Sequence, residues 1–275
     1  MPASSPPAPT VVVTGASDGI GAMAAHMLAA SGAHVVVVGR SVSKTRAVAE
    51  ALGAPWHVAD FAEFESVRTL AQELLRYPRI DVLANNAGMV VDHKEVRAGV
   101  ELSMKINHLS PFLLTQLLLP SLLDSHGSVI NTSSIANWIF ARPKSSHLLE
   151  PGHFSPMKAY GNSKLANILF THELHRRFAP TLRSAAFHPG VIRSNFAQGA
   201  KAWVWLVYQT PLRNVMLSSV EEGAFPLVRL ATTTEWESGA YYVNDRKGHT
   251  HHFARNPDHA AKLWEESMQA VGLTS

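Results

Sequence analysis

One short segment near the N-terminus limits the fold more than any other part of the chain. It holds three consecutive valines, a glycine-rich turn, an alanine-rich stretch and then four consecutive valines. Unbroken valine runs, here within residues 10–14 and 33–39, are typical of strands buried on both faces. The stretch between them has the composition of a helix and ends at Gly32. The segment therefore predicts a strand, a tight turn, a helix and a second, parallel strand.

The same alternation continues to the end of the chain. Further strands are predicted at residues 56–59, 81–84, 128–132, 182–187 and 240–243. Stretches of helical length separate them, and no linker or repeat interrupts the pattern. We therefore predict an α/β fold, a Rossmann-type doubly wound parallel sheet of about seven strands with helices on both faces. Residues 10–275 are expected to form one domain, and residues 1–9, rich in Pro, Ala and Ser, a disordered lead-in.

Composition excludes several classes of chemistry. The 275 residues include no Cys, which rules out disulfides, thiolate metal sites and thiol nucleophiles. A net charge of +3 is too small to indicate nucleic-acid binding. Apolar stretches stop short of the roughly 18 residues that a membrane span needs, and the first residues lack the pattern of a secretory signal. We expect a cytoplasmic protein. The histidines near the C-terminus, at positions 249, 251, 252 and 259, do not predict a metal site.

The glycine turn suits a dinucleotide. Gly15, Gly19 and Gly21 follow the first strand and open a helix. Glycine lets the backbone approach a pyrophosphate, whose charge is met by free N–H groups at the helix N-terminus. A tight turn that binds nothing is the alternative interpretation of this motif alone.

The spacing Thr14-Gly15-x-x-x-Gly19-x-Gly21 resembles the fingerprint of the short-chain dehydrogenase/reductase family. Other motifs of that family follow in the same order: Asn85-Asn86-Ala87-Gly88, Asn107, Ser133-Ser134, Tyr160-Gly161-Asn162-Ser163-Lys164 and Pro189-Gly190. Residues 160–178 and the sequence His188-Pro189-Gly190 are most similar to the retinol-dehydrogenase-like and WW-domain-oxidoreductase-like branch. We expect neither the WW domain nor the membrane anchor of that branch here.

The resemblance implies a nicotinamide cofactor, and charge indicates which one. Relatives that prefer NAD place an acidic residue at the end of the second strand, where it binds the ribose 2′-hydroxyl. Here Arg40 follows Gly39, and a guanidinium can pair with a 2′-phosphate, so NADP(H) is predicted. An arginine that merely caps the strand is the alternative. The resemblance implies further cofactor contacts from Gly15, Ser17, Asp18, Gly19, Ile20, Asp60, Phe61, Asn86, Ala87, Gly88, Tyr160, Lys164, Pro189, Gly190, Ile192 and Ser194.

Tyr160 and Lys164 are four residues apart, which places both on one face of a helix. Such a pair is commonly just a solvated helix face. A nearby ammonium would, however, lower the pKa of a tyrosine from about 10 and make it a usable general acid/base. The resemblance implies that Ser134 holds the substrate oxygen, that Lys164 also binds the nicotinamide ribose, and that Asn107 holds a water of a proton relay.

The predicted activity is NADPH-dependent reduction of a small-molecule ketone or aldehyde to an alcohol, with Tyr160 as the general acid. Residues 137–158 and 196–219 break the alternation and are predicted to be substrate loops. Trp203, Trp205 and Tyr208 favour a bulky hydrophobic substrate, unless they belong to the core or to a dimer interface. The alternatives are an NAD-dependent alcohol dehydrogenase working oxidatively and a nucleotide-binding regulator without turnover. Relatives are commonly homodimers or homotetramers, and the sequence decides neither.

Overall fold

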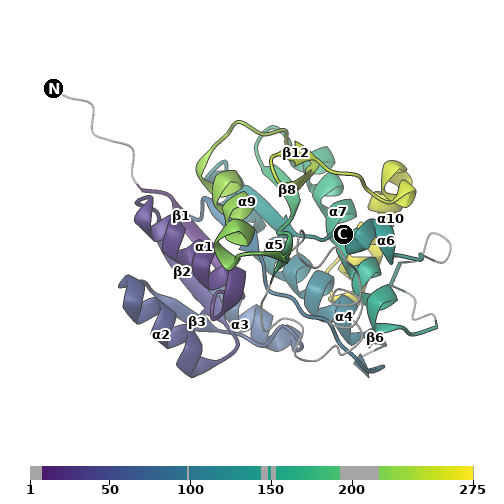
Figure 1. The fold of residues 1–275 in the computed structure, drawn as a ribbon, viewed down its shortest axis with the longest axis horizontal. Helices are drawn as coiled ribbons and strands as arrows, with labels where there is room; N and C mark the ends of the chain where they lie inside the picture. The colour runs from purple at the N-terminus through teal and green to yellow at the C-terminus, as the bar shows by residue number, and fades with distance from the viewer. Residues whose placement is uncertain (1–7, 98, 144–147, 150–152, 193–216, 275) are drawn as a thin grey trace.

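A single eight-stranded sheet forms the centre of the computed structural model, which describes residues 8–97, 99–143, 148–149, 153–192 and 217–274 (Figure 1). The strand order is β12-β11-β8-β7-β4-β1-β2-β3. All neighbouring strands are parallel except β11 and β12. The strands are β1 (Thr10–Thr14), β2 (His34–Gly39), β3 (Trp56–Val58), β4 (Val82–Asn85), β7 (Ser128–Thr132), β8 (Arg183–His188), β11 (Ala240–Val243) and β12 (Arg246–Lys247).

The predicted doubly wound sheet is confirmed, and each of its seven predicted strands is present within a residue or two of its expected bounds. The eighth strand, β12, was not predicted, because two residues are too few to carry an apolar pattern. Two short pairs lie outside the sheet: β5 (Val96–Arg97) with β6 (Val100–Glu101), and β9 (Val191–Ile192) with β10 (Leu217–Ser218).

Helices cover both faces of the sheet, because the side chains of each buried strand alternate between two apolar cores. Val11 and Val13 face a core built with α1, α2 and α9, and Figure 1 shows α1 beside α9 on that face. Val12 faces the opposite core, built with α3, α5 and α7. The helices are α1 (Gly19–Ala30), α2 (Val42–Leu52), α3 (Phe64–Leu74), α5 (Ser110–Asp124), α6 (Ala136–Ile139), α7 (Pro156–Phe178), α9 (Val220–Thr232) and α10 (Pro257–Ala270).

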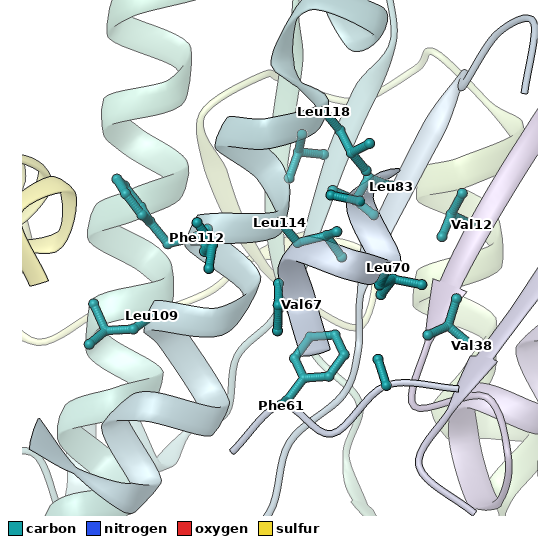
Figure 2. Close-up of a cluster of buried hydrophobic side chains, with 14 of the residues drawn as sticks. Val12, Val38, Phe61, Val67, Leu70, Leu83, Leu109, Phe112, Leu114 and Leu118 are labelled. Carbon is teal, nitrogen blue, oxygen red and sulfur yellow. The ribbon is translucent and has the colours of Figure 1, made fainter. Parts of the chain in front are cut away.

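The second core is the larger of the two, and Figure 2 shows its centre between β1, α3 and α5. Leu70, Leu83 and Leu114 point toward one another there and are at most 2% exposed. The C-terminal helix α10 extends this core beyond α7, because Trp264 packs edge-on against Phe112 with ring centres 5.1 Å apart. The N-terminal β-α-β unit and the C-terminal helix therefore contribute side chains to the same apolar core.

One helical stretch of the described residues, Leu102–Asp124, is long and apolar enough to cross a membrane by length and composition alone. It consists of α4 (Leu102–Met104), the π-helical turn η1 (Lys105–Leu109) and α5. Its mean hydropathy is 1.2, and 67% of the window is buried inside the protein. A core helix has the same properties, so this stretch is weak evidence for a membrane span.

Candidate active site

The site lies at the carboxyl edge of the sheet, where β1 and β4 are neighbours and the order of strands reverses. Thr14 joins the two strand ends. Its hydroxyl donates to the Ala84 carbonyl (3.1 Å) and accepts from the N–H groups of Asn86 (2.9 Å) and Ala87 (3.0 Å). This uses the one donor and both lone pairs of the hydroxyl. The loop after β4 is thereby held against the glycine turn.

The glycine turn is packed too closely to admit side chains. A Cβ atom on Gly21 would lie 2.3 Å from the Gly15 carbonyl oxygen and 2.6 Å from the Asn86 side-chain nitrogen. Gly15 and Gly19 have φ values of 68° and 55°, which non-glycine residues rarely adopt. At its glycines, the turn therefore has no side chain to cover the backbone at the edge of the sheet, and the N–H groups of the first turn of α1 lie beside it. These features fit the phosphates of a dinucleotide.

Asp18 caps α1, and its charge is balanced by a lysine. One carboxylate oxygen accepts from the Gly19 N–H (2.8 Å), and the other is 2.7 Å from the Lys44 ammonium. A carboxylate in a phosphate-binding turn would repel the ligand, so the ion pair with Lys44 reduces that repulsion. Lys44 was not among the predicted site residues, because its closeness to the turn depends on how α2 packs.

Arg40 lies at the end of β2, next to the glycine turn. It is exposed and forms no hydrogen bond or ion pair with any residue that the structure describes. Ser17 lies directly over Gly39, since a Cβ on that glycine would approach the Ser17 Cβ to 2.6 Å. The Ser17 hydroxyl and the Arg40 guanidinium, which has no partner among the described residues, thus flank the position where a ribose 2′-substituent is expected.

Asp60 and Phe61, predicted near the adenine, follow β3 at the same edge. The Asp60 carboxylate accepts from the Ala62 N–H (3.0 Å). The Phe61 ring is only 6% exposed and lies in the core near Val67, as Figure 2 shows, while its carbonyl accepts from Ser110 (2.6 Å). Any contact of Phe61 with an adenine would therefore come from its backbone.

Ser134, Tyr160 and Lys164 are brought together, as the sequence predicted. Ser134 follows β7, and its hydroxyl forms a hydrogen bond with the Tyr160 side chain. Both Tyr160 and Lys164 are buried, and the Lys164 ammonium lies 5.4 Å from the centre of the Tyr160 ring. Ser133, considered the less suitable serine, instead donates to the Lys164 carbonyl (2.8 Å). Of the two serines, Ser134 is therefore the one whose hydroxyl faces Tyr160.

The net pKa shift of Tyr160 is opposite to the lowering expected from a nearby ammonium. Burial raises the pKa of Tyr160 above its usual value near 10, and the bond with Ser134 only partly opposes this. Burial also lowers the pKa of Lys164 from 10.5 to about 7, because the charged amine is removed from water. The amine donates to the Thr132 carbonyl (3.0 Å).

Asn107 lies in the π-helical turn η1 and is fully buried. Its side-chain nitrogen donates to the Met89 carbonyl (2.9 Å) and the Ser163 hydroxyl (3.0 Å), and its oxygen accepts from the Met89 N–H (2.8 Å). A Cβ on Gly88 would lie 3.0 Å from the Asn107 oxygen and 3.3 Å from the Lys164 amine. Asn107 therefore adjoins the site, and its water-binding role stays a prediction.

The sequence did not predict Asn137, which forms a hydrogen bond with the backbone of Ser134. Asn137 is fully buried on α6, and its side-chain nitrogen donates to the Ser134 carbonyl (2.7 Å). Its oxygen accepts from the His251 N–H (3.1 Å), so a segment more than 100 residues away helps to hold the loop. The sequence showed only a broken segment here, without a signal for this contact.

The C-terminal histidines have structural contacts. The His251 ring accepts from the Phe253 N–H (3.2 Å), and the His259 ring bonds to the Phe253 carbonyl (2.9 Å) and stacks on the Phe253 ring. These contacts order the 3₁₀ turn η4 (His252–Arg255) before α10. No group of three or more metal-ligating side chains occurs among the residues that the structure describes.

The last predicted cofactor motif is only partly described. Pro189 and Gly190 follow β8, and Gly190 has a φ of 88°. Ile192 belongs to the short strand β9, which pairs with β10. Ser194, most of the predicted loop at 196–219 and the aromatic residues at positions 203, 205 and 208 lie outside the described residues.

Fold and site together define a class of protein, the dinucleotide-binding α/β oxidoreductases that place a tyrosine beside a lysine on one helix. Within this class the chain belongs to the short-chain dehydrogenase family, whose pattern it matches over residues 9–205. Members of this family are oxidoreductases that bind NAD(P).

Relatives support the retinol-dehydrogenase-like branch. The chain is 39% identical to a proposed daunorubicin C-13 ketoreductase of Streptomyces sp. (strain C5), over 98% of this chain and 94% of that protein. It is 32% identical to mouse retinol dehydrogenase 12, over 97% of this chain and 87% of that protein.

Solved structures share the fold. A protein of uncharacterised function from Mycobacterium paratuberculosis is 32% identical, with a TM-score of 0.76 over 96% of this chain and 94% of its own. A short-chain dehydrogenase from Shigella flexneri, solved in complex with NADP, is 27% identical, with a TM-score of 0.67 over 86% of this chain and 97% of its own.

Proposed function

We propose that this oxidoreductase uses NADPH to reduce a bulky, hydrophobic ketone or aldehyde to an alcohol. The single observation that carries the cofactor choice is Arg40, exposed beside Ser17 and without a partner among the described residues. A guanidinium pairs well with a phosphate dianion, whereas a bare ribose hydroxyl gains little from it. No carboxylate follows β2 to bind that hydroxyl, because Gly39 is followed by Arg40 and Ser41.

The raised pKa of Tyr160 suits the role of a general acid in a reduction. At neutral pH the buried phenol keeps its proton, and a general acid must carry a proton to give one to a forming alkoxide. Ser134 would hold the same oxygen by a second hydrogen bond, as an oxyanion donor does. A bound reduced nicotinamide supplies the hydride. Tyr160 and Ser134 thus stabilise the oxygen on which negative charge develops.

Apolar surface beside the serine supports a hydrophobic substrate. Trp138 and Ile139 belong to α6, a few residues after Ser134, and are 59% and 40% exposed. Large apolar side chains exposed next to a reacting group commonly bind an apolar ligand. One relative carries the name of a ketoreductase and another that of a retinol dehydrogenase, so the names of the relatives do not fix the direction.

A titration with NADPH and NADH tests the proposal. Energy transfer from the tryptophans to the nicotinamide reports binding of each cofactor, in the wild type and in the Arg40→Asp variant. We expect the wild type to bind NADPH at least tenfold more tightly, and Arg40→Asp to lose or reverse that preference, as expected for a charge-assisted phosphate contact worth about 1.5 to 3 kcal/mol.

The matched control is Arg246→Asp, an exposed arginine on β12 at the opposite end of the sheet from β2. It should leave both affinities unchanged. Equal binding of the two cofactors by the wild type, or tighter binding of NADH, would instead favour an NAD-dependent alcohol dehydrogenase. An unchanged ratio in Arg40→Asp would mean that Arg40 does not contact the 2′-phosphate. Binding without consumption of NADPH on a broad panel of carbonyl compounds would favour a regulator.

A further inference from the structure

A chain of buried polar side chains runs from the C-terminal helix to the active-site lysine. Ser267 on α10, His108 on η1 and Asn167 on α7 are at most 3% exposed. The His108 ring bonds through Nε2 to the Ser267 hydroxyl (3.0 Å) and through Nδ1 to the Asn167 side-chain oxygen (3.3 Å). The Asn167 side-chain nitrogen donates to the Thr132 carbonyl (3.1 Å) at the end of β7. Hydrogen bonds therefore link α10, η1 and α7 in series to one carbonyl group at the end of β7.

Chemistry fixes the direction of each hydrogen bond. The Thr132 carbonyl can only accept, so the amide nitrogen of Asn167 must face it and the amide oxygen must face His108. Nδ1 of His108 therefore carries a hydrogen. Burial lowers the pKa of His108 to about 4, so the ring is neutral at pH 7 and its Nε2 accepts from Ser267. These hydrogen bonds can therefore form together in only one arrangement of their hydrogens.

The chain ends on the group that holds Lys164. The Lys164 amine donates to the same Thr132 carbonyl (3.0 Å), so the two lone pairs of that oxygen are shared between Lys164 and Asn167. Both residues project from α7, three positions apart. Among the described residues, the titratable groups near Lys164 include Tyr160 and His108, and both are neutral at pH 7. Tyr241, which interacts with Tyr160, is neutral as well because burial raises its pKa. Asn167 and the Lys164 amine therefore share one acceptor.

We propose that His108 and Asn167 are positioning residues for Lys164. They act by holding the Thr132 carbonyl, which accepts from the Lys164 amine, and they link this carbonyl by hydrogen bonds to the C-terminal helix. The effect of these residues on catalysis rests on the proposed function, in which Lys164 faces the cofactor and Tyr160. Their effect on the placement of the amine does not rest on that function, and it can be measured without cofactor or substrate. A polar chain that served stability alone would affect folding but not the titration of Lys164.

The test follows the titration of Lys164 by NMR, with lysine labelled with ¹³C at Cε and the Lys164 signal assigned by its loss in Lys164→Met. Asn167→Ala removes a competing donor from Thr132 and admits water near the amine. Both changes favour the charged form, so the apparent pKa of Lys164 should rise by about one pH unit.

Asn131→Ala is the matched control. Asn131 is 1% exposed, lies one residue before Thr132, and also donates one side-chain hydrogen bond (to Thr171, 2.9 Å) and accepts one (from Asn85, 3.0 Å). It has no bond to the lysine, so this variant should leave the Lys164 titration unchanged. Equal titration curves in both variants, or a shift of the same size in both, would overturn the proposal.

Variants of His108 keep the test decisive if Asn167→Ala does not fold. Glutamine can donate to Asn167 as the imidazole does, whereas leucine cannot. We expect His108→Gln to retain the wild-type titration of Lys164 and His108→Leu to raise its pKa. No difference between these two variants would contradict the proposal. With a ketone that the enzyme reduces, Asn167→Ala should lower kcat by about tenfold with little change in the KM of the ketone. Absence of any turnover in the wild type would count against the proposed function alone.

Discussion

Replacing Lys164 with Met is expected to make the protein more stable at neutral pH. Lys164 is 2% exposed, and burial lowers its pKa from 10.5 to about 7. In the unfolded chain the amine is solvated and keeps a pKa near 10.4. The folded protein therefore disfavours the charged form of Lys164, and folding carries that cost. Methionine has a similar length and shape and no charge to bury.

The magnitude follows from the two pKa values. Each pKa unit corresponds to 1.36 kcal/mol, so at pH 7 the lysine costs folding about 4 kcal/mol. The variant loses the hydrogen bond to the Thr132 carbonyl, worth about 1 kcal/mol, but that oxygen still accepts from Asn167 and is not left unpaired. A net gain of about 2 to 3 kcal/mol remains. At 2 to 4 °C per kcal/mol, Tm should rise by roughly 5 to 10 °C.

The gain should depend on pH with a definite sign. The folded-state pKa of Lys164 lies below the unfolded one, so its cost is complete below about pH 7 and disappears as pH rises toward 10.5. Urea unfolding of the wild type and Lys164→Met at pH 6, 7 and 10 measures this. Lys94→Met, at an exposed lysine, is the control and should show no such dependence. A variant less stable than the wild type at pH 7, or a gain as large at pH 10 as at pH 7, would refute the reasoning.

Two further predictions concern the crevice and the substrate. Thr14→Val removes the hydroxyl that forms hydrogen bonds with Ala84, Asn86 and Ala87, and it leaves two N–H groups unpaired. The free energy of unfolding in urea should therefore fall by about 3 kcal/mol, and NADPH binding should weaken. Wild-type stability of the variant would contradict this role of Thr14. Trp138→Ser removes exposed apolar surface near Ser134 in the sequence, so steady-state kinetics should show a roughly tenfold higher KM for a bulky apolar ketone and an unchanged KM for a small one. An equal change for both ketones would mean that Trp138 does not contact the substrate.

The arrangement of the sheet could be predicted because its signal is local. Valine runs at 11–13 and 35–38 can be buried on both sides only in a sheet covered on both faces, and both runs are at most 3% exposed. The glycine spacing predicted the turn for a similar reason, since Gly21 has no room for a Cβ. The four-residue interval between Tyr160 and Lys164 correctly placed both side chains on one face of a helix, with the ammonium 5.4 Å from the centre of the ring.

Properties that depend on packing between distant segments could not be predicted. The pKa of Tyr160 follows from its burial, which outweighs the hydrogen bond with Ser134 and depends on segments far apart in the sequence. Asn137 and Asn167 act through backbone carbonyls, and a carbonyl has no sequence signature. Likewise the ion pair between Asp18 and Lys44 depends on the packing of α2 beside the turn.

The most direct test of the account measures NADPH consumption by the wild type and by Tyr160→Phe with a panel of bulky hydrophobic ketones and aldehydes. We predict that the wild type consumes NADPH with at least one of them, and that Tyr160→Phe binds NADPH with wild-type affinity but does not turn over. The phenyl ring keeps the shape of the site and removes only the proton donor that Ser134 contacts. Turnover by Tyr160→Phe at the wild-type rate would contradict the assignment of the general acid, and failure of the wild type to bind either NADPH or NADH would contradict the account as a whole.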